Sequence, residues 1–214
     1  MPTASAPHAL DFGRATVHRN RSVPFLVEKA ITNGEGVLAS NGALCVDTGE
    51  RTGRSPADKF LEDTPAIHDD IKWGNVNQAI SSKHFQQLEE LAHEHLAGRD
   101  ELYRFDGYAG ADPQYRLNVS VITEKAWHSL FARTLFINAE RDAMADFEPT
   151  WTIINACDLK IDNPEEYGLN SPIAILQSLE QKKVLILGTH YAGEIKKSIF
   201  YAMNYDLPEM DVFP

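Results

Sequence analysis

Apolar positions spaced three and four residues apart predict an amphipathic helix over 81–98. A serine stands where it can cap the start of this helix, and Gly98 follows its last turn. The apolar face consists of Phe85, Leu88, Leu91, Ala92, His95 and Leu96. This stretch carries the clearest helical pattern in the chain.

Three further segments, 22–33, 123–136 and 192–205, carry the same periodicity in shorter form. Ser22 is expected to cap the first of these helices and Thr123 the second. These three segments and 81–98 are the four predicted helices, and the predicted strands lie between them.

Short apolar runs bounded by turn residues predict the strands. They lie at 36–49, as two strands around Asn41-Gly42, at 101–110, 115–123 and 150–159, and at 172–190, as two strands around a polar "EQKK". Because strands and helices interleave, the sequence predicts an α/β fold with one mixed β-sheet covered by helices.

We find no internal repeat and no linker, so a single domain over 22–214 is the simplest organisation. Residues 1–21 are polar and aperiodic, and we expect them to form a flexible N-terminal tail. Residues 61–80 are acidic and carry no clear period, so we expect them to be irregular.

The chain has 214 residues and a formal net charge of −11, from 31 acidic residues against 20 lysines and arginines. This charge disfavours nucleic acid as the main partner, because neutralising phosphates requires a basic surface. It does not exclude a small anion, which needs only a local cluster of cations. No apolar run approaches the roughly 20 residues that cross a bilayer. The N-terminus also lacks the charged-then-apolar order of a secretory signal, so we expect a cytoplasmic protein with no membrane partner.

The two cysteines, Cys45 and Cys157, both stand in apolar, strand-like stretches. Two cysteines in such positions do not indicate a disulfide framework. We expect both to be reduced residues of the core.

Gly188 and Gly193 have the spacing of a nucleotide phosphate loop. In such a loop the next two residues are Lys and then Ser or Thr, whereas here they are Glu194 and Ile195. A glutamate would face phosphate oxygens with the wrong sign. The 214 residues therefore contain no phosphate loop of this kind.

Arg54 lies in "TGRSP", a small loop bounded by glycine and proline. Such a loop can hold a guanidinium at the edge of a cleft, where its planar fork suits a carboxylate or a phosphate. The alternative is an arginine in a surface ion pair, and the spacing alone leaves both interpretations open.

Lys196 and Lys197 stand side by side near the start of the last predicted helix, shortly after Tyr191 at the end of a predicted strand. They could be two solvated helix lysines. However, the positive end of a helix disfavours cations, and a lysine near other cations loses its proton more easily. Only the neutral amine has a lone pair for a metal or a proton. The residues by themselves indicate an anion or metal site and go no further.

Taken together, several segments resemble the N-terminal domain of the ATP-dependent phosphoenolpyruvate carboxykinases. They are "VDTGERTGRSPADKF", "YRFDGYAGADPQYRLNVSVITEKAWHSLFARTLF", "EYGLNS" and "GTHYAGEIKKSIFYAMNYDLP". The order and approximate spacing agree from about residue 22 to the end. The combination of "TGRSP", "YAGEIKK" and "MNY-x-LP" carries the resemblance, and the GTP-dependent enzymes differ around the corresponding lysine.

This resemblance implies a protein that takes part in gluconeogenesis by converting oxaloacetate and ATP to phosphoenolpyruvate, CO2 and ADP, with Mg-ATP and a second divalent metal, typically Mn2+. By resemblance, Arg54 binds the carboxylate of the substrate or CO2, and Tyr191 contacts the substrate or CO2. Lys197 is similar to the lysine that ligates Mn2+ as a neutral amine and contacts the substrate. Lys196 is similar to the neighbour that reaches the enolate and the transferred phosphoryl group.

The family's phosphate loop and its remaining metal ligands, a histidine and an aspartate, follow the "MNY-x-LP" segment. The sequence stops six residues after Pro208, so we expect the nucleotide-binding domain to be absent. On that expectation the isolated chain is inactive and binds neither Mn2+ nor Mg-ATP, since a metal site needs several ligands. Smaller departures from the family are Ala57, His190, Ile195 and Ser198.

A second hypothesis remains beside this one. The chain could be a stand-alone, non-catalytic protein that binds small dicarboxylates or regulates a full-length carboxykinase. A third is assembly with a separately encoded nucleotide domain.

Overall fold

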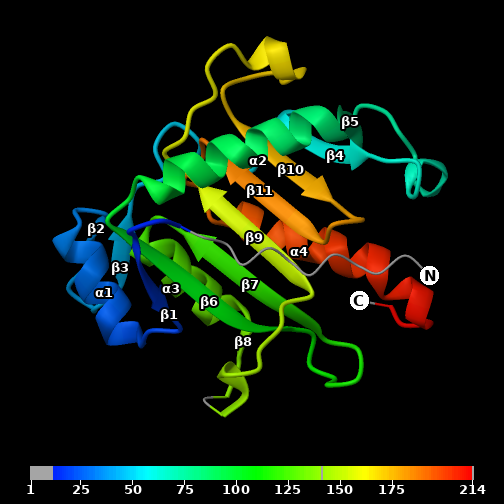
Figure 1. Ribbon diagram of the computed structural model, residues 1–214. Coiled ribbons are helices and arrows are strands. Elements are labelled where there is room, and N and C mark those ends of the chain that lie inside the picture. The colour runs from blue at the N-terminus through cyan, green and yellow to red at the C-terminus, as the bar shows by residue number, and fades with distance from the viewer. Residues whose placement is uncertain (1–11, 141, 214) are drawn as a thin grey trace.

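A nine-stranded mixed sheet forms the centre of the computed structural model, which describes residues 12–140 and 142–213 (Figure 1). The strands run in the order β1-β6-β7-β9-β11-β10-β4-β5, with β8 paired to β6, and β2 and β3 form a separate two-stranded sheet. The strands are β1 (Thr16–Arg19), β2 (Gly36–Leu38), β3 (Leu44–Val46), β4 (Lys59–Asp63), β5 (Gln78–Ser81), β6 (Glu101–Ala109), β7 (Leu117–Thr123), β8 (Ile137–Asn138), β9 (Trp151–Ala156), β10 (Ala174–Ser178) and β11 (Lys183–Leu187).

The α-helices of the described residues are α1 (Val23–Thr32), α2 (Ser82–Ala97), α3 (Ala126–Leu135) and α4 (Gly193–Asp206). Helix α2 covers one face of the sheet, and α3 and α4 lie behind the other face in the view of Figure 1. The architecture is therefore three-layered, and the predicted α/β class with a mixed sheet covered by helices is confirmed.

Strand β11 shows why the central strands are continuous apolar runs. Leu185 and Leu187 pack in the hydrophobic cluster of α2, whereas Val184 and Ile186 pack in the cluster that contains Ile199 of α4. Successive side chains of a strand point to opposite faces, so a strand covered on both faces has no polar side to show.

The directions of the strands bring distant segments to one edge of the sheet. Strands β7, β9 and β11 are parallel to one another, β10 is antiparallel to β11, and β4 is parallel to β10. The carboxyl ends of β7, β9 and β11 therefore lie at the same edge as the amino ends of β10 and β4. We call this edge the site edge.

The predicted helices and most predicted strands are confirmed, but three strands are not where the pattern indicated. β4 and most of β5 lie within or at the border of 61–80, which was expected to be irregular. β1 lies within the expected tail, where it pairs in parallel with β6, so that tail does not extend through 16–19. Residues 1–11 of the expected tail lie outside the described residues.

The sequence predicted that Thr123 caps the helix at 123–136, which is α3, and this prediction is wrong. Thr123 is the last residue of β7, and its hydroxyl donates to the carbonyl of Lys125. The backbone amides at the start of α3, which have no partner within the helix, are instead bound by Glu35, whose two carboxylate oxygens accept from Ala126 N at 3.1 Å and Trp127 N at 3.0 Å. A carboxylate at a helix N-terminus is favourable for the helix dipole, but a cap supplied from 91 residues away leaves no local sequence signal.

The cysteines divide between two environments. Cys157 is buried as expected, whereas Cys45 is exposed in the β2–β3 hairpin, and neither forms a disulfide. The expectation of a core position for Cys45 is wrong because that small sheet lies apart from the central one (Figure 1).

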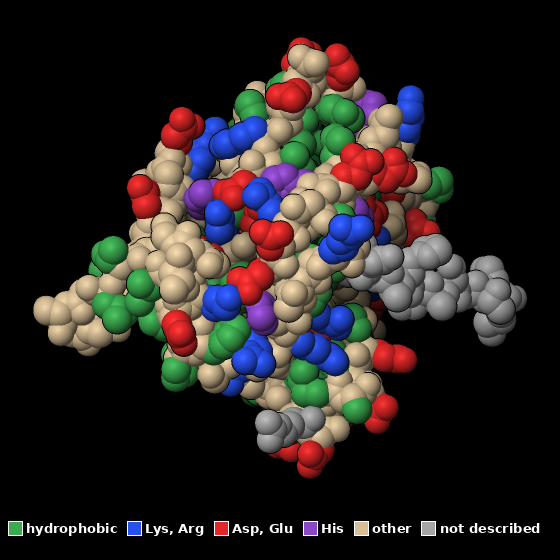
Figure 2. Space-filling view, turned by 60° about the vertical axis from the view of Figure 1, so that its left-hand side comes forward, with side chains coloured by type: hydrophobic (Ala, Val, Ile, Leu, Met, Phe, Trp, Pro, Cys, Tyr) green, Lys and Arg blue, Asp and Glu red, His purple; other side chains and the backbone are tan. Residues whose placement is uncertain are grey.

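None of the helices in the described part of the chain is long and apolar enough to cross a membrane. Figure 2 shows one face of the molecule, on which lysine and arginine side chains lie among acidic and histidine side chains. Positive charge on this face is therefore distributed in local groups.

Glu101 joins three elements at the start of β6. Its Oε1 accepts from Lys29 Nζ of α1 at 2.5 Å and lies 2.9 Å from His18 Nε2 of β1. The hydrogen bond with Lys29 has the largest effect, and together with that of His18 it lowers the pKa of the Glu101 carboxyl to about 2. A carboxyl with a lowered pKa stabilises the fold above its unfolded pKa and loses that contribution as pH falls.

We therefore expect Glu101→Gln to reduce the acid sensitivity of folding between pH about 4.5 and 2. The free energy of unfolding, measured by urea denaturation at several pH values, should depend less on pH in the variant than in the wild type. Glu28→Gln, on the exposed face of α1, is the matched control and should keep the wild-type dependence. An unchanged pH slope in Glu101→Gln would contradict the assignment.

Candidate functional site

Arg54 and Tyr191 lie at the site edge although they are 137 positions apart in the sequence. The loop that carries Arg54 leads into the amino end of β4, and Tyr191 follows the carboxyl end of β11 and precedes α4. Because β4 and β11 have opposite directions, the start of one and the end of the other meet at this edge. In open α/β sheets this is where ligands bind.

Glu194 connects the two segments. It lies in the first turn of α4 with no exposed surface, and its Oε1 accepts from the backbone N–H of Ser55 at 2.9 Å. Its Oε2 lies 3.2 Å from Lys59 Nζ, an ion pair without the alignment of a hydrogen bond. One buried carboxylate thus fixes the residue after Arg54 to the helix that carries the two lysines.

Two glycines permit the chain to turn from β11 into α4. Gly188 has φ +72°, and a Cβ there would lie 2.8 Å from the carbonyl oxygen of Pro172. A Cβ on Gly193 would lie 2.4 Å from the ring of Tyr191. The ring of Tyr191 therefore lies against the start of α4, in a space that only glycine leaves open.

The two lysines have different environments. Lys196 is exposed, whereas Lys197 is half-buried, with its Nζ 5.3 Å from the centroid of the Phe200 ring. No carboxylate among the described residues pairs with either lysine, so their charges remain available for a ligand.

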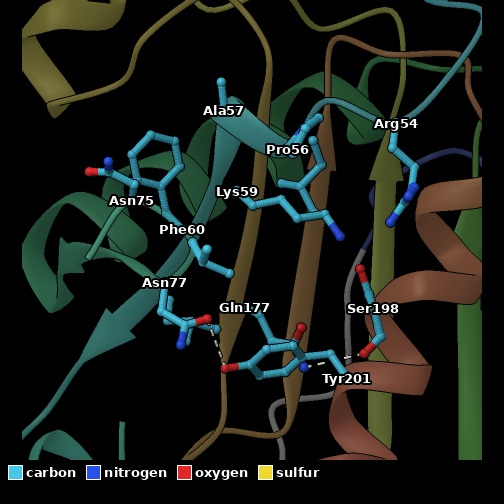
Figure 3. A pocket seen from close by; sticks show the side chains of 13 residues that line it. Arg54, Pro56, Ala57, Lys59, Phe60, Asn75, Asn77, Gln177, Ser198 and Tyr201 are labelled. Atoms are coloured by element: carbon cyan, nitrogen blue, oxygen red, sulfur yellow. Dashed lines mark hydrogen bonds between the residues drawn. The ribbon is translucent and has the colours of Figure 1, made fainter. Parts of the chain in front are cut away.

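Arg54 is exposed and makes no ion pair with any described residue. The alternative of an arginine in a surface ion pair is therefore not what the structure shows. The neighbouring Arg51 does make one, at 3.7 Å from the Asp58 carboxylate. Arg54 lines a pocket at the site edge (Figure 3).

A polar network beneath Tyr191 was not predicted from the sequence. Asp158, just after β9, lies 2.7 Å from His190 Nε2 and accepts from Lys125 Nζ at 2.8 Å. The hydrogen bond with His190, and after it the one with Lys125, lowers the pKa of the Asp158 carboxyl far below its usual range although the residue is partly buried. The signal was a titratable residue within three positions of the end of each of β7, β9 and β11, namely Glu124, Asp158 and His190. The strand pairing was needed to show that these residues meet.

His128 anchors the same turn from below. It is fully buried, and its Nε2 lies 2.8 Å from the backbone carbonyl oxygen of His190. Burial lowers the pKa of His128 to about 3, so the ring is neutral at physiological pH and donates to that carbonyl. This bond holds the backbone immediately before Tyr191.

Cys157, Asp158 and His190 offer ligand atoms that all lie within 4.8 Å of one another. Burial, and after it the nearby carboxylates, raise the pKa of the Cys157 thiol far above its usual range. Lys125 already neutralises Asp158. The group is therefore organised as a hydrogen-bonded support for the turn, and Lys197 is not part of it.

Comparisons with known proteins give one consistent result. A family model described as phosphoenolpyruvate carboxykinase matches residues 15–214. Phosphoenolpyruvate carboxykinase (ATP) of Brevibacillus brevis is 50% identical over 202 residues, which cover 94% of this chain and 38% of that relative. Phosphoenolpyruvate carboxykinase (ATP) 1 of Moorella thermoacetica is 48% identical over 199 residues, which cover 93% of this chain and 38% of the relative. The chain thus spans 38% of the length of these relatives.

Removing the Glu194 carboxylate should destabilise the fold and loosen the Arg54 loop. Glu194→Ala leaves the buried N–H of Ser55 without its charged acceptor, which costs about 3 kcal/mol, whereas Glu194→Gln keeps an acceptor and costs about 1 kcal/mol. Urea denaturation gives these energies, and amide hydrogen exchange at Ser55 reports the loop.

The exposed Glu180, changed to alanine, is the control and should alter neither measurement. Wild-type protection of the Ser55 amide in Glu194→Ala would show that the carboxylate does not hold the loop.

Proposed function

The chain belongs to the ATP-type phosphoenolpyruvate carboxykinase family, and on that premise we propose that it supplies the oxaloacetate-binding part of the carboxykinase site. In this reaction oxaloacetate loses CO2, and the resulting enolate oxygen takes the γ-phosphoryl group of ATP, which leaves ADP. The observation that supports the proposal is the buried bond between Ser55 N and Glu194 Oε1, which joins the Arg54 loop to the lysine helix.

Each of the four site residues has a role that its environment permits. The unpaired guanidinium of Arg54 can bind a substrate carboxylate in bidentate fashion. The ring of Tyr191, fixed against Gly193, contacts the substrate or CO2. Lys196, exposed and unpaired within the described chain, stabilises the charge that develops on the enolate and on the transferred phosphoryl group.

Lys197 is the residue of this chain that would ligate Mn2+. Its nitrogen has no carboxylate partner among the described residues, so it is not committed to an ion pair, and as a neutral amine it can donate one lone pair. A bound divalent metal would act as a Lewis acid toward the enolate oxygen. In the proposal, the other metal ligands and the groups that bind Mg-ATP are not among these 214 residues, which contain no G-x-x-x-x-G-K-[ST] sequence.

We expect the 214-residue chain alone to form no phosphoenolpyruvate when mixed with oxaloacetate, ATP, Mg2+ and Mn2+, because one lysine does not make a metal site. A coupled assay for phosphoenolpyruvate measures this, with the Brevibacillus brevis relative as the positive control. Turnover by the chain alone would contradict the proposed division of the site.

A transplant tests the residues themselves. We expect residues 15–214 to support activity when they replace the matching segment of the Brevibacillus brevis relative. In that chimera, Arg54→Gln should lower kcat/KM for oxaloacetate about 100-fold, the value of a charge-assisted bond of about 2.7 kcal/mol. Arg51→Gln is the matched control and should change kcat/KM less than threefold.

If the chimera is active and Arg54→Gln does not change its kcat/KM for oxaloacetate, the proposed role of Arg54 is refuted. A folded but inactive chimera, together with binding of succinate by the chain alone, would favour the stand-alone dicarboxylate-binding hypothesis.

A further inference from the structure

A pocket of about 450 Å³ lies between the start of β4, β10, α4 and the loop before β5. It exists because the sheet continues past β11 to β10 and β4, while the loop that contains Asn77 returns over the same face. Tyr201 of α4 donates to Asn77 Oδ1 at 3.3 Å and closes one side (Figure 3). The volume is in the range of small-molecule sites.

The interior of this pocket is mostly apolar. Leu61 and Ile175 from adjacent strands and the ring of Tyr201 line it on the side of α4. Leu61 and Ile175 are each at most 5% exposed, so they form a fixed surface. Burial of an apolar group against such a surface is favourable in proportion to its area.

One end of the pocket is polar and positively charged. Arg54 and Lys59 line it, and in Figure 3 the hydroxyl of Ser198 points to the same side as these two cations. Ser198 is 1% exposed, and its Oγ has no hydrogen-bond partner in the described chain. A buried hydroxyl without a partner costs free energy unless something else binds it, so this oxygen indicates a ligand.

We propose that this pocket binds a small amphipathic monocarboxylate, with its carboxylate at Ser198, Lys59 and Arg54 and its apolar body over Leu61 and Ile175. Lys59 retains donors for the ligand because its ammonium has three and one faces Glu194. A dicarboxylate is disfavoured because its second charge would enter the apolar interior without a partner. The site therefore selects a different class of ligand from oxaloacetate, and it does not depend on the carboxykinase reaction.

The first test is a chain-length series with the 214-residue protein. Butanoate, pentanoate and hexanoate, titrated by NMR, should bind with a Kd that falls about fourfold for each added methylene. Hexanamide, which lacks the charge, should bind at least tenfold more weakly than hexanoate, and glutarate at least tenfold more weakly than pentanoate. Amide shifts should centre on Leu61 and Ser198. A Kd independent of chain length, or shifts centred elsewhere, would overturn the proposal.

The second test separates ligand binding from folding. Ser198→Ala should weaken hexanoate binding about tenfold and leave the urea midpoint unchanged or higher, because the hydroxyl that is removed has no partner among the described residues. Ala57→Phe fills the exposed rim of the pocket and should abolish binding. Ala43→Phe, on the exposed β2–β3 turn, is the control and should bind as the wild type does.

Hexanoate binding that is unchanged in both Ser198→Ala and Ala57→Phe would show that the ligand does not enter this pocket.

Discussion

The buried carboxylate of Glu194 is the contact on which the arrangement of the site depends. It accepts from Ser55 N at 2.9 Å and lies 3.2 Å from Lys59 Nζ, so the loop before β4 and the start of α4 keep one relative position. A carboxylate in the first turn of a helix is also favoured by the helix dipole. Glu194, which does not fit the phosphate-loop sequence, is therefore the residue that joins the Arg54 loop to α4.

The direction of the strands explains why this contact can form. β11 ends and β4 begins at the site edge because β10, between them, is antiparallel to β11 and parallel to β4. At the same edge, His128 holds the carbonyl of His190 and Asp158 holds its ring. Tyr191 thus follows a turn whose backbone is held by hydrogen bonds on the side of the sheet. On the side of the helix, its ring lies against Gly193.

The sequence correctly predicted those helices and strands whose pattern lies within their own residues. The helices follow their apolar period, and the hairpin of β10 and β11 follows its two apolar runs. The errors came from contacts between distant residues. Glu35 caps α3 from outside, and β4 and β5 gain their places from strand pairing, β4 with β10 and β5 with β4, rather than from alternation. Arg54, Tyr191 and the lysine pair were candidates from the sequence and stay predictions, whereas Glu194 was interpreted only as a mismatch, and Ser198 only as a departure. Both roles depend on burial, which no single sequence shows.

The period of α4 assigns different environments to adjacent residues, and this decides what the site can bind. Ile195, Ile199 and Ala202 face the core, whereas Ser198 and Tyr201, one turn apart, face the pocket. Lys196 and Phe200, four apart, are exposed. Positions three or four apart share a face of a helix, so the exposed lysine and the pocket serine lie on separate faces although only Lys197 stands between them. One helix can therefore present cations to a polar substrate at its start and a hydroxyl to an amphipathic ligand on its flank, with Arg54 at the border of both.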